Sequence, residues 1–108
     1  MSGEFAGMLK ERIRIEKPVE LRTGSGLQQA GWEPVASCLA AIMAEGAGAE
    51  AEAQALSAMP RYRVTIRSRD GVSVGQRVNW GGRTMLVKQR IDHPALPDRI
   101  LLRCEEVR

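Results

Sequence analysis

The sequence predicts a mainly β protein, a small antiparallel β-barrel or sandwich of about six strands with one short helical insertion between the second and third strands. Apolar and polar residues alternate in several short stretches, which is typical of strands with one face on a core. Turn signals of glycine, proline or Asp-Gly separate these stretches. Long helical patterns do not alternate with them, which argues against parallel β-α-β units.

The length predicts one domain, residues 1–108, because single domains usually contain about 100–150 residues. A composition of 44% hydrophobic and 27% charged residues is typical of a folded chain. Residues 1–8 are expected to form a flexible N-terminus. They lack the basic start and long apolar run of a secretory signal, so no such signal is expected. No run of apolar residues is long enough for a membrane span, so we expect no membrane partner and synthesis in the cytoplasm.

The first strand is predicted over residues 10–21. Its apolar side chains lie at alternate positions, and Lys17 is the one charged residue in that series. The apolar residues are Ile13, Ile15, Val19 and Leu21. Pro18 indicates a bend or an edge position, because proline cannot donate to a ladder. Residues 22–31 are rich in glycine and polar residues and are expected to form a flexible connection.

A nearly continuous apolar run over residues 32–44 predicts a long strand buried on both faces. Its alanines leave a helix open as the alternative. The following segment, residues 45–59, is the predicted insertion. Alanine, glutamate and glutamine favour a short helix over residues 49–58, reached through a hinge at Gly46 and Gly48.

Strand patterns return after Pro60. Residues 61–67 alternate between apolar and basic side chains, and Asp70-Gly71 marks the next turn. A hairpin is predicted from two strands, residues 76–80 and 83–91, joined by Gly81-Gly82. A last strand is predicted over residues 99–107.

Charge is divided unevenly along the chain. Residues 1–60 carry five basic and eight acidic side chains, whereas residues 61–108 carry eleven and five. Thirteen of the sixteen basic residues are arginine, which pairs with carboxylates and phosphates in a bidentate manner. The two halves could therefore pair across subunits, or the basic half could face nucleic acid.

The order of these patterns resembles a known family. The first predicted strand contains ERIRIEKP and is followed by a glycine-rich loop. The second predicted strand contains WEPVASCLAAI and leads into the insertion. After the insertion come a basic and apolar strand with its turn, the hairpin and the last strand, with the sequences RYRVTIRSRDGV, VGQRVNWGGRTMLV and LLRCEEV. Over residues 9–106 this layout is similar to the head-tail joining, or head-closure, proteins of tailed bacteriophages and gene transfer agents, although no single motif in it is specific.

The resemblance implies a structural virion protein that forms a six-fold or twelve-fold homo-oligomeric ring in the head-tail connector. Its partners would be a portal or adaptor protein on the head side and a tail terminator or tail protein on the other side. DNA would pass through the channel without specific binding. The resemblance places the protein in the virion neck, assembled in the bacterial host cytoplasm.

In this family the insertion after the second strand can help close the channel. Carried over to this chain, the candidate channel-facing residues of that plug are Glu45, Gly46, Gly48, Glu50 and Glu52. Carboxylates there would repel the DNA polyanion. A plain solvent-exposed helix is the alternative.

A second set of candidate residues would contact neighbouring subunits or partners: Arg61, Arg63, Arg67, Arg69 and Trp80. The arginines project from one strand face, which could also be merely solvated or contact DNA. Subunit pairing is favoured over DNA contact, because tight phosphate binding repeated around a ring would trap the DNA. Trp80 could stack on a base or a partner ring, or pack on the core.

Catalytic chemistry is not expected. The chain has one histidine, His93, and two cysteines, Cys38 and Cys104, with no zinc-site spacing between them. GxSxG, GxGxxG and P-loop motifs do not occur, so no enzyme activity, metal or cofactor is predicted. The alternative functions are a small barrel that binds single-stranded nucleic acid, for which few aromatic residues are available, and a tail-side neck component of the same particle.

Overall fold

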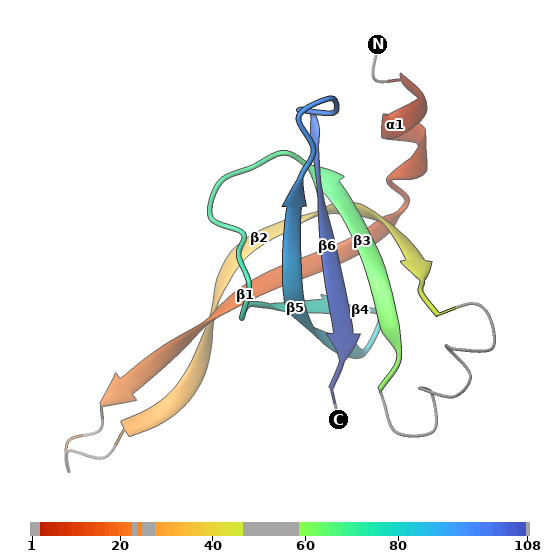
Figure 1. Cartoon of the computed structure of the whole chain (residues 1–108). Helices are drawn as coiled ribbons and strands as arrows, with labels where there is room; N and C mark the ends of the chain where they lie inside the picture. The colour runs from red at the N-terminus through yellow and green to blue at the C-terminus, as the bar shows by residue number, and fades with distance from the viewer. Residues whose placement is uncertain (1–2, 23, 25–27, 47–58, 108) are drawn as a thin grey trace.

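A computed structural model describes residues 3–22, 24, 28–46 and 59–107 (Figure 1). The described residues form one helix and six strands: α1 (Gly3–Met8), β1 (Glu11–Arg22), β2 (Gln28–Ala44), β3 (Arg61–Arg67), β4 (Arg77–Trp80), β5 (Arg83–Asp92) and β6 (Arg99–Glu106). The strands are antiparallel and close into a barrel in the order β1-β2-β3-β6-β5-β4, because β4 pairs back onto β1. The predicted fold class is therefore confirmed.

The barrel interior holds the hydrophobic core. Its alternating inward side chains include β-branched residues from five of the strands, which suit a pleated and half-buried surface. The buried cluster consists of Ile13, Ile15, Ala40, Val64, Ile66, Val72, Val78, Met85, Val87, Ile100, Leu102 and Cys104. The described part of the chain contains no helix long and apolar enough to cross a bilayer.

The strands after residue 60 match their prediction closely. β3 has the predicted bounds, and the ends of β4, β5 and β6 differ from the predicted ends by one residue. The hairpin between β4 and β5 turns at Gly81 and Gly82, whose φ angles of +52° and +84° lie in the left-handed region. Glycine is favoured there, as in the two-residue turns that match strand twist.

β1 and β2 extend well beyond the barrel. β4 pairs with β1 only over residues 14–16, and β3 pairs with β2 only over residues 41–44. Residues 17–22 and 28–33 pair with each other and project together (Figure 1). We call this two-stranded projection the arm.

The arm corrects the prediction of a flexible connection over residues 22–31. Residues 28–31 belong to β2, and their partners on β1 are residues 19–22. Their sequence has no apolar period, but pairing with the neighbouring strand overrides weak strand propensity. Residues 23 and 25–27 lie outside the described residues. Pro18 lies in the arm, where β1 has β2 as its only described neighbour, so its predicted edge position is confirmed.

A β-bulge marks the place where the arm leaves the barrel. Ile15 pairs with Ala36 and Glu16 pairs with Pro34, so Val35 is an additional residue on β2. Such a bulge bends the strand and increases its twist. The bulge therefore redirects the β1–β2 pair out of the barrel wall.

The β2 region is a strand, as predicted, and the helical alternative is wrong. Its predicted burial on both faces is also wrong, because Trp32, Leu39 and Met43 are 36%, 43% and 62% exposed. In a barrel each strand has one face on the core and one outside, whereas burial of both faces requires a covering layer.

The N-terminal residues also differ from their prediction. Residues 1–8 were expected to be flexible, but α1 occupies Gly3–Met8 and is held by Phe5, which is 3% exposed. The guanidinium of Arg99 lies 3.9 Å from the centroid of the Phe5 ring, and that of Arg67 lies 5.9 Å from it. A six-residue helix is marginal alone, so docking on the barrel stabilises it.

Candidate interaction surfaces

The described residues hold no group of three or more histidine, cysteine or acidic side chains that could bind a metal ion. His93 lies exposed in the β5–β6 loop, where its Nδ1 accepts a hydrogen bond from the amide of Ala95 at 3.1 Å. Both cysteines are free thiols. Burial, with a smaller effect of Glu45, raises the pKa of the Cys104 thiol to about 12, so it is protonated at neutral pH.

The predicted arginine row lies on the outside of the barrel. Arg61, Arg63 and Arg67 alternate with inward residues along β3, and Arg69 follows the end of the strand. All four side chains are exposed. Arg67 also faces the Phe5 ring, so it contributes to docking α1. The role of these residues in subunit contacts stays a prediction.

Trp80 is engaged within the chain. Its indole Nε1 donates a hydrogen bond to Glu11 Oε1 at 3.0 Å, and its ring meets Tyr62 edge-on with centroids 5.6 Å apart. The Arg83 guanidinium lies 5.7 Å from the Trp80 ring centroid. Trp80 therefore packs beside the core. This agrees better with the predicted alternative of packing on the core than with stacking on a base or a partner ring.

One predicted plug residue has a defined place at the end of β2. The Oε2 atom of Glu45 accepts a hydrogen bond from Arg103 Nη2 at 3.1 Å, and the amide of Glu45 donates to the carbonyl of Arg61 at 2.9 Å. Gly46 follows with a φ of +100°. Gly48, Glu50 and Glu52, and the predicted helix over residues 49–58, lie outside the described residues.

A buried ionic cluster at the base of the arm was not predicted. Glu16 is only 9% exposed, and its Oε1 accepts hydrogen bonds from Arg77 Nε at 2.7 Å and Asn79 Nδ2 at 2.6 Å. Arg14 Nε lies 3.8 Å from Glu16 Oε2. The hydrogen bond from Arg77, opposed by burial, is the main reason that the pKa of Glu16 lies below its ordinary value.

Arg77 connects β4 to both strands of the arm. Besides binding Glu16 on β1, its guanidinium lies 4.3 Å from the ring centroid of Trp32 on β2. The acidic and basic halves of the chain thus pair in part within one subunit, here and in the pair between Glu45 and Arg103. No local pattern indicates this cluster, because Glu16 falls in the polar parity of its strand.

An apolar stripe runs along the outer face of β2. Three apolar side chains point outward there: Leu39, Ala41 and Met43. We call these three residues the β2 stripe. On one side Arg12 of β1 pairs with Leu39, and on the other side Arg63 of β3 pairs with Met43. Next to the stripe lies a cavity of 180 Å³. Its lining residues are Ala6, Leu9, Cys38, Leu39, Arg67 and Arg69.

Comparisons with known proteins agree with this architecture. A family model described as phage head completion protein matches residues 6–107. A Shigella flexneri 2a protein solved in solution is 22% identical, with a TM-score of 0.69 over 93% of this chain and 94% of that chain. A chain in the virion of a native gene transfer agent particle is 15% identical, with a TM-score of 0.63 over 92% and 96% of the two chains. No curated protein matches the chain.

Proposed function

The chain belongs to the family of phage head completion proteins, and from that premise we propose that it forms a ring in the neck of a phage or gene transfer particle. The family makes it a structural protein of the phage head or neck. The proposed ring lies between a portal or adaptor protein and a tail terminator or other tail protein. The similar chain in a gene transfer agent virion supports a place in such a particle.

The observation that carries the proposal is the arm on a closed barrel. A barrel satisfies the hydrogen-bonding edges of its own strands, so a small protein of this kind has no internal need for a projection. The two arm segments pair with each other along their whole length, and β1 has no other ladder partner there among the described residues. Such a projection provides contact surface for neighbours in an assembly.

Closure of the DNA channel is the second part of the proposal. β2 ends at Ala44 and β3 begins at Arg61, so residues 45–60, which include the insertion over residues 45–59, connect two adjacent strands of the barrel wall. The carboxylates of Glu50 and Glu52 would face the channel together with Gly46 and Gly48, next to Glu45, whose own carboxylate is paired with Arg103. Repeated negative charge repels the phosphate backbone, so DNA passes without specific binding.

We further propose that the protein acts through complementary surfaces and not as an enzyme. The rival function, single-stranded nucleic-acid binding, requires exposed aromatic platforms. Among the described residues Phe5 is buried, Trp80 is hydrogen-bonded to Glu11, and the Trp32 ring is covered on one side by Arg77. Few aromatic faces are thus available for stacking on bases.

Electron microscopy of purified particles and of the purified protein tests the proposal. We expect a ring at the neck that is absent from particles assembled without this protein. Replacement of residues 47–58 by a Gly-Ser linker of equal length should leave the ring and release packaged DNA, whereas substitution of the exposed Leu96 by Ser should retain it. A wild-type particle with no density for this chain at the neck would overturn the proposal.

A further inference from the structure

We propose that the arm of one copy docks face-on against the β2 stripe of the next copy, so that identical head-to-tail contacts close the ring. This inference rests on the proposed ring and assigns its subunit interface. The two surfaces have complementary chemistry: the described side chains on one face of the arm are apolar apart from one carboxylate, and the stripe is apolar between two guanidinium groups.

The arm face follows from the register of the ladder. Side chains directly opposite one another lie on the same face, so the pairs Pro18 with Trp32 and Glu20 with Ala30 define one face. All four residues are exposed. Tryptophan is enriched among the residues that dominate binding energy at interfaces. Trp32 is therefore the expected anchor of this contact.

The opposite face of the arm is less suited to this contact. Its described pairs are Lys17 with Glu33 and Val19 with Gly31, so it presents two opposite charges that offset each other and one half-buried valine. The arm edges are also unsuitable, because Pro18 and Pro34 each remove one ladder donor and the bulge at Val35 interrupts the strand. Docking through the apolar face thus agrees better with the sequence than extension of the sheet.

The β2 stripe provides the matching surface. Leu39 and Met43 are 43% and 62% exposed, which is unusual for two large apolar side chains on one strand face. Arg12 and Arg63 flank them, and neither forms an ion pair within the described part of the chain. Glu20 of the arm likewise has no ionic partner among the described residues.

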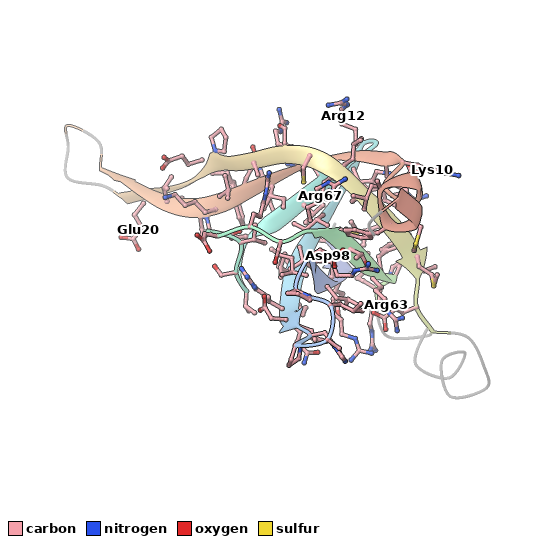
Figure 2. The ribbon with its side chains drawn as sticks, turned by 90° about the horizontal axis from the view of Figure 1, so that it is seen from above. Lys10, Arg12, Glu20, Arg63, Arg67 and Asp98 are labelled. Carbon is pink, nitrogen blue, oxygen red and sulfur yellow. The ribbon has the colours of Figure 1, made fainter. Side chains whose placement is uncertain are left out.

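The unpaired charges are separated along the molecule. Figure 2 shows Glu20 on the arm at one end and, toward the other end, four basic residues with Asp98 among them: Lys10, Arg12, Arg63 and Arg67. Two different complementary surfaces on one chain give a heterologous contact, which closes into a ring when the rotation between copies permits. A DNA partner agrees less well with the stripe, because protein–DNA interfaces are more polar and the stripe centre is aliphatic.

Cysteine crosslinking tests the contact directly. In a Cys38→Ala background, Ala30→Cys places a thiol on the arm face and Met43→Cys places one on the stripe, while Cys104 is only 2% exposed. In assembled rings a short bismaleimide should link three or more copies in series, because each copy offers one thiol to each neighbour. The matched pair Ala30→Cys with Leu96→Cys, and each single variant, should give no species larger than a dimer.

Charge reversal supplies a second measurement. Glu20→Arg and Arg63→Glu should each weaken ring assembly roughly tenfold, since each replaces an attraction by a repulsion. The combined variant should recover most of the wild-type assembly. Recovery distinguishes a direct contact from a general loss of stability, which a second substitution would not reverse.

The possible outcomes separate this inference from the proposed function. Wild-type rings without serial crosslinks, or crosslinks only to a different virion protein, would overturn the arm-to-stripe contact and leave the ring intact. Normal rings that lose DNA in Arg63→Glu alone would also overturn it, because they would place DNA on the stripe. Absence of any wild-type ring would instead overturn the proposed function.

Discussion

Replacement of Glu16 by glutamine should destabilise the barrel and the arm together. Glu16→Gln keeps the shape of the side chain and an oxygen acceptor, but it removes the negative charge that strengthens the hydrogen bonds from Arg77 and Asn79 at 2.7 and 2.6 Å. Loss of one partner from a fully buried pair costs about 3–5 kcal/mol. Because the Arg77 side chain is 28% exposed and water can reach it, we expect about 2–3 kcal/mol here.

Urea and thermal unfolding followed by circular dichroism at neutral pH would measure this loss. For a chain of this size, a loss of that order lowers Tm by roughly 10–15 °C. Glu20→Gln is the matched control, since Glu20 is exposed on the arm, and it should change stability by less than about 0.5 kcal/mol. A Glu16→Gln protein as stable as this control would refute the role assigned to the cluster.

The pH dependence provides an independent check of the same pair. The hydrogen bond from Arg77 is the main cause that lowers the pKa of Glu16 below its ordinary value of 4.5. A carboxyl with a lowered folded-state pKa stabilises the protein fully above its unfolded-state pKa, and this stabilisation disappears as the pH falls through the folded-state pKa. The stability difference between wild type and Glu16→Gln should therefore be constant near neutral pH and shrink below about pH 4.5.

Three further predictions concern other parts of the chain. Phe5→Ala should cost about 1.5–3 kcal/mol and accelerate amide exchange in α1 specifically, because it removes the buried anchor of a helix too short to persist alone. A thiol reagent should label Cys38 well before Cys104 in the native protein, and equal rates would contradict the burial described here. Gly82→Ala should cost about 1 kcal/mol at a φ of +84°, whereas Gly7→Ala in α1 should be neutral or stabilising in the same denaturation assay.

Local alternation made much of the barrel predictable. In β3 the residues between Arg61 and Arg67 switch faces at every position, and the positive φ angles at Gly81 and Gly82 match a short hairpin turn. The family resemblance based on the order of these patterns is confirmed by the family match over residues 6–107. Period-two patterns and glycine turns are local signals, so a single sequence is sufficient to read them.

The remaining features depend on contacts between distant residues. α1 has only weak local signals, a serine before it and apolar residues at Phe5, Met8 and Leu9, and its six residues are stabilised by Phe5 packing near Arg99. The exposure of Leu39 depends on which side of β2 faces the barrel, which its alanine-rich sequence does not specify. The burial of Glu16 depends on a partner 61 positions away, so charge pattern along β1 could not predict it.

The closure between β1 and β4 has a mechanical consequence. Only three residue pairs, between residues 14–16 and 77–79, join these strands, whereas seven pairs join β3 to β6. This narrow seam adjoins the point where the arm departs, and the contacts of Arg77 with Glu16 and Trp32 lie across the same point. Tension applied to the arm would therefore be transmitted first to the seam, and the barrel would open there before its other ladders separate.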